Sequence, residues 1–363
     1  MAEEIIPFKI IEQIEYKAVD FFCGGGGMTY GLRQAGINVV AGVDFDKDAK
    51  ETYEFNNPGS KFVLADINEL KEEYFEVNFK LTRNDDNLIL VGCSPCQFYS
   101  IINAPKLNAK KSKDLLLQFQ RFIDYYNPGY VLVENVPGIM TNKDTILPKF
   151  LHFLEDKQYK IVTKVINMKD YGVPQNRRRF SLIATRLDRE ITLPVKEKEI
   201  KRFCDCLGKD NGFPEIPAGY NDPSDYAHTV AGLKGKNKKR LAKTEKDGGT
   251  RLAWKDDPEL QLKCYIGKDT SFVDVYGRMF WERPSSTITT KFFNISNGRF
   301  AHPFEDRAIS IREGAVLQSF PKEYVFKTKS ISTAAKLIGN AVPPEYAKRV
   351  GLKIINHLAD GTI

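Results

Sequence analysis

Short apolar runs alternate with longer mixed segments over the first 186 residues of the chain. Six of these runs have the length and composition of strands, at residues 16–22, 37–45, 61–66, 87–93, 130–136 and 179–186. Several are apolar without interruption, which is typical of strands buried on both faces of a sheet. Residues 28–36 and 114–126 instead repeat their apolar positions at helical spacing. The alternation predicts an α/β fold with a parallel sheet covered by helices on both faces.

The pattern changes near residue 187. Residues 190–280 are rich in Gly, Pro, Asp and Lys, and their apolar periodicity is weak. We interpret this stretch as a second, irregular domain or a large insertion. Regular patterning returns at residues 312–320 and 332–358, and we expect the latter to form a C-terminal helix that docks back onto the sheet.

Composition and charge narrow the class of protein only slightly. The chain has 363 residues, of which 42% are hydrophobic, and this allows two domains with well-buried cores. The formal net charge of +7 permits nucleic-acid binding without requiring it. No apolar run is long enough to span a membrane, and the acidic N-terminal segment lacks a signal-peptide cleavage site, so we expect a cytoplasmic protein.

Six cysteines are too sparse for a disulfide framework in a chain of this length. Cys93 and Cys96 form a C-x-x-C pair, a pattern that also occurs in metal and redox sites. No second pair has zinc-ligand spacing, because Cys204 and Cys206 are too close together and the four histidines are scattered. We therefore expect no bound metal, and a zinc or redox protein built on the C-x-x-C pair stays an alternative.

A glycine-rich segment, residues 20–27, follows the first predicted strand and precedes a predicted helix. Glycines at such a turn let the backbone approach a ligand closely at the helix N-terminus. The segment is not a dinucleotide fingerprint, because Thr29 stands where the third glycine of G-x-G-x-x-G would be. A tight turn without a ligand is the alternative at this point.

Acidic residues end the next two predicted strands. Asp44 follows the second strand, where a carboxylate can accept hydrogen bonds from both hydroxyls of a ribose. Phe45 can stack on an adenine ring, and Asp66, at the end of the third strand, can accept a hydrogen bond from an adenine amino group. Each acid alone is compatible with a solvated strand end. The glycine-rich end of the first strand and the two acidic strand ends together favour an adenosine ligand.

The fourth and fifth predicted strands lead into candidate catalytic side chains. Cys96 lies just past the fourth strand, at the edge where open α/β sheets bind ligands, and the backbone amides that follow favour its thiolate. Glu134 ends an apolar run, so burial is expected to raise its pKa and to suit it to proton donation. A structural hydrogen bond at the strand end is the alternative role for Glu134.

Six ordered motifs give the chain a specific resemblance. They are Phe-x-Gly-x-Gly-Gly from Phe22, Pro-Cys-Gln from Pro95, Glu-Asn-Val from Glu134, Gln-Asn-Arg-Arg-Arg from Gln175, Arg-Glu-x-x-x-Leu-Gln-x-Phe-Pro at 312–321 and Gly-Asn-Ala-Val-Pro-Pro from Gly339. The sequence resembles the DNA cytosine-5 methyltransferases over residues 18–350, with a gap at the variable region. Two positions depart from the family: Cys93-Ser94 precedes Pro95 where Gly-Gly or Gly-Ser is frequent, and Asp44 replaces the more frequent Glu.

The resemblance implies a Rossmann-like sheet that binds S-adenosyl-L-methionine, with a smaller irregular target-recognition domain. Together with the change of pattern, it predicts a catalytic and cofactor-binding domain at residues 1–186 plus 325–363 and a target-recognition domain at 187–324. The cofactor-binding residues that it implies are Phe22, Gly24, Gly26, Gly27, Asp44, Phe45, Asp66, Ile67, Asn340, Ala341 and Val342.

The same resemblance implies how the reaction proceeds. Cys96 would attack carbon 6 of cytosine, and Glu134 would be the partner of ring N3. Arg179 would hold the base O2, and Arg177 would lie near the nucleophile and the phosphate. The target base must be flipped out of the duplex, because these atoms are not accessible within it. Residues 98–113 resemble the family's mobile loop that closes over DNA, and a solvated basic loop is the alternative.

Target recognition is expected in the variable region. Residues 232–251 contain eight Lys or Arg residues against two acidic residues, and their position favours contact with phosphates over a merely solvated face. The family also has a Thr-Leu-like pair in this region, for which Thr287-Ile288 is the candidate. The predicted DNA-binding residues are Ser100, Lys236, Lys238, Lys239, Arg240 and Thr287.

The expected partner is duplex DNA, bound by a monomer that associates with the bacterial nucleoid and with no membrane. The family also implies a cognate restriction endonuclease that acts independently on the same site. One alternative is an RNA methyltransferase of the same fold, the tRNA-methylating branch, whose Cys-Phe-Thr signature we do not find. Another is a non-enzymatic DNA-binding relative, against which the retention of Cys96, Glu134 and Arg179 argues.

Overall fold

The computed structural model describes residues 15–95, 114–141 and 145–356. Its centre is a seven-stranded sheet in the order β3-β2-β1-β4-β5-β7-β6. The strands are β1 (Lys17–Phe21), β2 (Asn38–Asp44), β3 (Lys61–Leu64), β4 (Leu88–Gly92), β5 (Tyr130–Asn135), β6 (Lys160–Asn167) and β7 (Arg178–Thr185). The first five pair in parallel, whereas β7 is antiparallel to both β5 and β6.

This sheet contains all six expected strands but corrects the expected topology in two ways. The strand expected at residues 179–186 is β7, which runs antiparallel because residues 168–177, between β6 and β7, are too few for a parallel crossover. β6 is an additional strand without a continuous apolar run. It lies half-exposed at the sheet edge, where polar residues are tolerated, so its sequence carries no clear strand signal.

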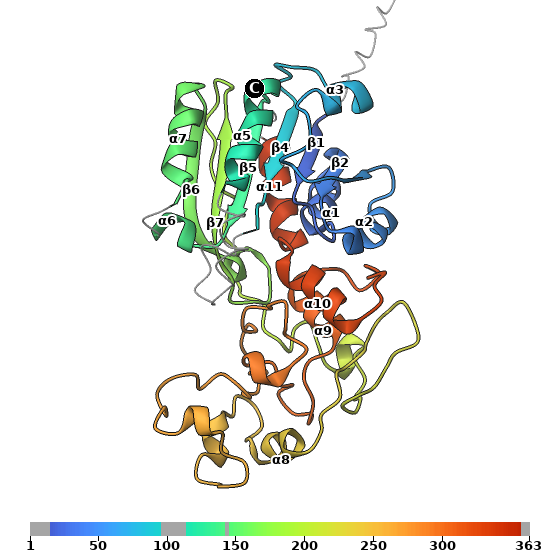
Figure 1. Ribbon diagram of the computed structural model, residues 1–363, viewed down its shortest axis with the longest axis vertical. Helices are drawn as coiled ribbons and strands as arrows, with labels where there is room; N and C mark the ends of the chain where they lie inside the picture. The colour runs from blue at the N-terminus through green and yellow to red at the C-terminus, as the bar shows by residue number, and fades with distance from the viewer. Residues whose placement is uncertain (1–14, 96–113, 142–144, 357–363) are drawn as a thin grey trace, which may run out of the picture.

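Helices cover both faces of the sheet (Figure 1). One face packs against α1 (Gly27–Gln34) and α11 (Pro344–Asn356). The other face packs against α3 (Tyr74–Phe79), α5 (Leu115–Tyr126) and α7 (Leu147–Asp156). The two helices expected from apolar spacing are therefore present, as α1 and α5. Two further short helices are α2 (Lys50–Asn56) and α6 (Gly138–Thr141).

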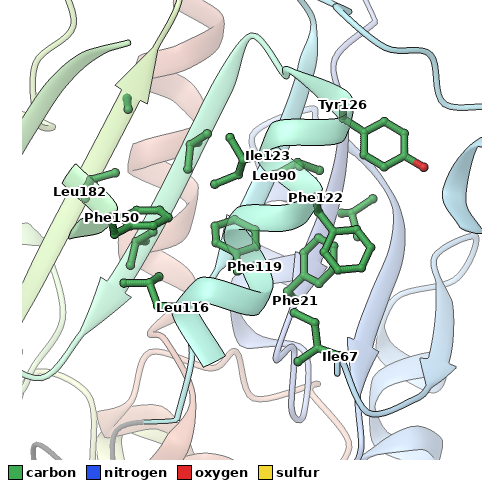
Figure 2. Close-up of a cluster of buried hydrophobic side chains, with 14 of the residues drawn as sticks. Phe21, Ile67, Leu90, Leu116, Phe119, Phe122, Ile123, Tyr126, Phe150 and Leu182 are labelled. Atoms are coloured by element: carbon green, nitrogen blue, oxygen red, sulfur yellow. The ribbon is translucent and has the colours of Figure 1, made fainter. Parts of the chain in front are cut away.

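Helix α5 packs against the sheet near the carboxyl ends of β1 and β4. Phe119 and Phe122 of α5 pack on Phe21 of β1, with ring centroids 5.3 and 4.8 Å from that of Phe21 (Figure 2). Burial of each such side chain stabilises the fold by about 1.5–3 kcal/mol. At the end of β4, a Cβ on Gly92 would lie 2.4 Å from the Phe119 ring. Gly92 therefore allows α5 to approach the sheet directly beside the Cys93–Pro95 segment.

A second region, residues 187–330, has little regular structure, as its sequence predicts. It includes α8 (Lys236–Lys243), α9 (Ile311–Leu317) and several 3-10 turns. Its larger hydrophobic cluster contains Phe203 and Phe292, and a smaller cluster lies around Trp254. In Figure 1 this region lies below the sheet, with α8 near the far end.

The C-terminal segment forms two helices instead of the single helix expected. α10 (Ile331–Asn340) packs with α9 in the larger cluster of the second region, whereas α11 returns to the sheet. The helix breaks before Pro343 and Pro344, because proline removes a backbone donor and disfavours helical backbone in the preceding residue. Among the described residues, no helix is both long and apolar enough to cross a lipid bilayer.

Candidate active site

The parallel strands end abreast at the sheet edge that faces the second region (Figure 1). Phe21 pairs with Val43 on one side and with Gly92 on the other, and Asp44 pairs with Leu64. The segments that follow β1 to β4 therefore meet at one edge, which is where open α/β sheets bind ligands. The strand-end residues predicted to bind the cofactor, Asp44, Phe45 and Asp66, lie at this edge.

The glycine-rich loop after β1 is tied to the end of β2 by Asp44. The Gly24 N–H donates to Asp44 Oδ2 at 2.8 Å, and the Asp46 N–H donates to Oδ1 at 2.9 Å. Burial raises the pKa of Asp44, and these two hydrogen bonds oppose the increase. Gly24 has a positive φ of 49°, and a Cβ there would meet no atom within 4 Å. The loop thus leaves open space beside its backbone, as a ligand-binding turn requires.

The loop also packs closely against the segment between α10 and α11. A Cβ on Gly27 would lie 2.5 Å from the Val342 carbonyl oxygen and 3.2 Å from the Ala341 Cβ. Gly26 has a φ of 88°, and a side chain there would collide with Asn57 and Tyr324. The structure therefore brings together two segments that lie more than 300 residues apart and that the resemblance assigns to one cofactor site.

The remaining candidate cofactor residues differ in their exposure. The Phe45 side chain is 68% exposed, so its ring is available to a ligand. Asp66 is exposed, and its Oδ1 accepts hydrogen bonds from the backbone N–H and the side chain of Asn68 at 2.9 and 2.7 Å. Ile67 is buried in the core beneath this edge, and Asn340 is exposed at the end of α10.

Buried polar groups support the loop in a way that the sequence analysis missed. Thr29 Oγ1 donates to Asp20 Oδ2 at 2.7 Å and lies 3.1 Å from the Tyr53 hydroxyl. All three side chains are fully buried, and desolvation raises the pKa of Asp20 to about 7. Thr29 was recognised only as a missing fingerprint glycine. Its pairing with Asp20, nine residues away, depends on the loop conformation and has no local sequence signal.

Glu134 and Arg179 meet where β5 ends and β7 begins. Asn135 pairs with Phe180, and Arg179 Nε lies 3.1 Å from Glu134 Oε1. Within the described residues, Oε1 accepts no hydrogen bond of good geometry. Burial raises the pKa of Glu134, and the positive charges of Arg179 and Arg177 only partly offset this increase. A buried carboxyl group with a raised pKa is suited to donating a proton or a hydrogen bond.

Arg177 is buried at the junction between the sheet and the second region. Its guanidinium donates to the carbonyl oxygens of Ile288, Gly339 and Ala341, each at 3.2 Å. Desolvation lowers the pKa of Arg177. In this arrangement the guanidinium joins three backbone segments and is not exposed to a phosphate.

Gln175 extends the same junction and was not singled out from the sequence. Its Nε2 donates to the Leu317 carbonyl at 3.0 Å and to Gln318 Oε1 at 2.6 Å. Its Oε1 accepts from the Ile288 N–H at 2.9 Å. Nearby, the Thr287 hydroxyl donates to the Asn176 carbonyl at 2.5 Å, so the candidate Thr-Leu-like pair belongs to this junction. Membership of the Gln-Asn-Arg-Arg-Arg motif was the only signal for Gln175.

The candidate nucleophile Cys96, Ser100 and the loop at 98–113 lie outside the described residues. The segment that leads to Cys96 is described as far as Pro95, with Cys93 half-buried and Ser94 buried. The Asn135 side chain lies 3.4 Å from Ser94 Oγ, which joins this segment to the end of β5 beside Glu134.

The predicted phosphate contacts in α8 divide into two kinds. Lys236, Lys238 and Lys239 are exposed, and Lys239 lies 3.7 Å from Glu259. Arg240 is buried: its Nε donates to the Leu260 carbonyl at 2.7 Å. Its guanidinium also lies 5.3 Å from the Trp254 ring centroid. Arg240 is therefore not available to a phosphate in this arrangement.

One cluster among the described residues has the donor atoms of a metal site, at His302, Glu305 and Glu313. Arg307 already pairs with both carboxylates, with Nε 2.8 Å from Glu305 Oε2 and Nη1 2.7 Å from Glu313 Oε2. This cation holds the pKa of Glu313 down to about 2, and desolvation lowers the pKa of His302 to about 4. The cluster is accounted for as an ion-pair network without a metal ion.

The strand order, the antiparallel β7 and the glycine-rich loop after β1 define the Rossmann-like fold of S-adenosylmethionine-dependent methyltransferases. Residues 16–356 match the family model of the C-5 cytosine-specific DNA methylases, so the chain belongs to this family and is a DNA cytosine-5 methyltransferase. This confirms the family resemblance and the fold class, with the change in strand direction described above.

Individual proteins agree with the family assignment. The chain is 36% identical over 350 residues to the type II methylase M.HgiDII of Herpetosiphon aurantiacus, covering 94% of this chain and 96% of the relative. It is 30% identical over 357 residues to the type II methyltransferase M.Eco47II of Escherichia coli, covering 95% and 80%. The solved structure of S. pombe Dnmt2 methyltransferase has the same fold, with a TM-score of 0.60 at 18% identity and coverage of 96% and 100%.

Proposed function

We propose that the enzyme transfers a methyl group from S-adenosyl-L-methionine to carbon 5 of a flipped-out cytosine in a specific duplex DNA sequence. The observation that carries this proposal is the pairing of buried Glu134 with half-buried Arg179, at the same sheet edge as the glycine-rich loop. A proton-donating carboxyl group and a cation at one place suit a pyrimidine that must be activated at N3 and held at O2.

The described residues fit the cofactor that the family uses. The open space at Gly24 accommodates a close ligand, and the exposed Phe45 ring offers a stacking surface for adenine. Asp44 would accept hydrogen bonds from the ribose, and Asp66 from the adenine amino group. The bound cofactor supplies an electrophilic sulfonium methyl group. Residues 341–342, which pack against Gly27 of the glycine-rich loop, would form the opposite wall of the cofactor site.

The chemistry assigned to the protein begins at carbon 6. The Cys96 thiolate attacks carbon 6 while Glu134 donates a proton or hydrogen bond to N3, which turns the ring into an enamine with a nucleophilic carbon 5. Arg179 stabilises charge at O2. Arg177 supports the site from the junction, where its guanidinium donates to the carbonyl oxygens of Ile288, Gly339 and Ala341. After methylation, a base such as a water molecule takes the carbon 5 proton. The electrons of the broken C–H bond re-form the carbon 5–carbon 6 double bond and expel the Cys96 thiolate.

We assign recognition of the target DNA sequence to residues 187–324, which make up most of the second region. The exposed Lys236 and Lys238 of α8 support a phosphate-contacting role for this region. Both relatives described above are type II methylases, which supports a role of this enzyme in restriction and modification. A cognate endonuclease, a monomeric state and a cytoplasmic location associated with the nucleoid stay predictions.

The test is to incubate the purified enzyme with labelled cofactor and either duplex DNA or tRNA. The same protein is expressed in a host whose DNA is then sequenced after bisulfite treatment. Label in DNA, with protected cytosines at one recurring sequence, is the expected result. Label in tRNA alone would establish the RNA-methylating alternative, and binding to DNA without label in either would establish the non-enzymatic one.

A further inference from the structure

A loop in the second region exposes two large apolar side chains. In residues 263–273 the Ile266 side chain is 64% exposed and the Phe272 side chain is 65% exposed. Phe272 also has a positive φ of 55°, a backbone conformation that is rare for a non-glycine residue and that needs support from its surroundings. Single exposed apolar side chains are ordinary on a protein surface, but two on one loop whose backbone is held from inside make the loop a candidate contact surface.

That support comes from a single buried arginine. Arg251 is fully buried, and its guanidinium donates to the carbonyl oxygens of Ser271 at 2.8 Å and Phe272 at 3.1 Å, and also to that of Lys268. The same guanidinium lies 4.6 Å from the ring centroid of Tyr265. Arg251 therefore fixes the loop backbone from inside while the Phe272 side chain points to solvent.

The loop belongs to the same small unit as α8. Arg251 begins the 3-10 turn Arg251–Trp254, which packs against α8. Trp254 ends this turn, and Tyr276 follows the loop in the sequence. Both lie in one hydrophobic cluster with Leu241 of α8. Buried Arg240 stacks near both of these rings, at 5.3 and 5.6 Å. The exposed lysines of α8 and the apolar side chains of the loop are thus supported by the same hydrophobic cluster.

The charge of the loop indicates the chemistry of its partner. Lys263 and Lys268 are exposed on either side of Ile266, and the negative charge of Asp269 is paired with Lys255 at 3.1 Å. Neither lysine has an ion-pair partner among the described residues, and both lie on the same loop as Ile266 and Phe272. This combination suits a polyanion that also has apolar surface. In duplex DNA the cations can contact phosphates, while apolar groups contact thymine methyl groups or base steps in a groove.

We propose that Ile266 and Phe272 contact base edges of the recognition sequence and contribute to its specificity, while Lys263 and Lys268 contact the flanking phosphates. This inference rests on the proposed function, because it assumes a duplex DNA substrate. It separates two roles within one loop: apolar side chains discriminate between sequences, and cations supply affinity that does not depend on sequence.

The experiment compares two sets of variants of the full chain on two DNAs. The cognate duplex carries the sequence found by bisulfite sequencing, and a second duplex of equal length lacks it. Ile266→Ala and Phe272→Ala are each expected to weaken binding to the cognate duplex by about tenfold, the usual effect of losing one good base contact. Binding to the unrelated duplex should be unchanged. The double variant Lys263→Gln/Lys268→Gln should weaken binding to both duplexes and flatten the salt dependence.

The matched control is Phe55→Ala, which removes a 55% exposed phenylalanine from α2, outside the second region, and should leave both affinities unchanged. Thermal unfolding of each variant shows that the fold is retained. Wild-type-like discrimination by both Ile266→Ala and Phe272→Ala, or equal losses on the two duplexes, would overturn the inference. If the wild type methylates no DNA at all, the proposed function itself fails, and this result is distinguishable from failure of the loop assignment.

Discussion

Glu134 illustrates how burial can prepare one side chain for catalysis. Two arginines lie near its carboxyl group and would by themselves lower its pKa, yet desolvation is the larger effect and raises it. The protonated form therefore persists to higher pH than in an exposed glutamate. An apolar strand that ends in Glu predicts that the pKa of this residue is raised. The ion pair with Arg179 is not predicted, because it depends on the pairing of β5 with β7.

The first residue-scale prediction follows from this protonation state. Glu134→Gln should reduce single-turnover methylation by about 100-fold or more, because an amide cannot deliver a proton to N3. In the wild type, the rate should fall as pH rises through the raised pKa, since the active protonated form is lost. This decline should be absent from the residual activity of the variant. A rate that is equal in both proteins at every pH would contradict the assigned role.

A second prediction concerns the adenine platform. Phe45→Ala should weaken cofactor binding by about 1 kcal/mol, or roughly fivefold, through lost stacking. Isothermal titration with S-adenosyl-L-homocysteine measures this without turnover. Phe55→Ala removes a comparably exposed ring from the same part of the chain and serves as the control. Equal affinities in the wild type and Phe45→Ala would show that adenine binds elsewhere.

At the scale of elements, α8 separates side chains that the sequence could not separate. The sequence does not distinguish the four cations at residues 236–240, but only the lysines are exposed, because Arg240 turns inward to the Leu260 carbonyl. We predict that Lys236→Gln/Lys238→Gln/Lys239→Gln flattens the salt dependence of DNA binding, by up to about 0.9 in slope for each lost phosphate contact. Binding to related and unrelated duplexes should weaken equally.

The contrast within α8 provides its own control. Arg240→Gln should lower the free energy of unfolding, because it leaves the Leu260 carbonyl and the face of Trp254 without their partner. Its salt slope should stay close to that of the wild type. An unchanged slope in the triple lysine variant would mean that α8 is a solvated face.

The sequence predicts the buried elements better than the half-exposed ones. β1 to β5 and α5 carry continuous or periodic apolar residues because both sides or one face of each is buried, and each was located correctly. β6 lacks that signal because one of its edges and much of its surface are exposed. Apolar periodicity alone does not predict the break between α10 and α11, because two adjacent amphipathic segments resemble one long helix.

At the scale of the whole molecule, one short segment joins the sheet to the second region. Gln175 and Arg177 reach three places far apart in sequence: Ile288, the end of α9 at Leu317–Gln318, and Gly339–Ala341. Sequence motifs marked these residues as important but assigned Arg177 a role at the nucleophile. The long-range contacts depend on the tertiary fold, so no local pattern could have indicated this joining role.

This junction predicts a distinct kinetic phenotype. Gln175→Ala removes three buried hydrogen bonds and leaves the Ile288 N–H unpaired, at a cost of about 1–3 kcal/mol. Because the second region then loses its fixed position, the KM for DNA should rise and sequence discrimination should weaken, while S-adenosyl-L-homocysteine affinity stays close to wild type. Gln175→Glu keeps the acceptor for the Ile288 N–H but places a buried carboxylate oxygen against the Leu317 carbonyl and Gln318 Oε1, so it should not restore the wild-type values. A loss confined to thermal stability would reduce Gln175 to a merely structural role.

The most direct test of the account is covalent trapping at the predicted nucleophile. Duplex DNA with 5-fluorocytosine at the target position should form a denaturation-resistant complex with the wild type in the presence of cofactor, because fluorine cannot leave as a proton. Cys96→Ser should form no such complex and should not methylate DNA, since an unactivated hydroxyl is a far weaker nucleophile than a thiolate. Cys93→Ser should behave like the wild type, which separates this mechanism from metal or redox chemistry at the C-x-x-C pair. Methylation by Cys96→Ser at the wild-type rate, or trapping that requires Cys93 instead, would contradict the account.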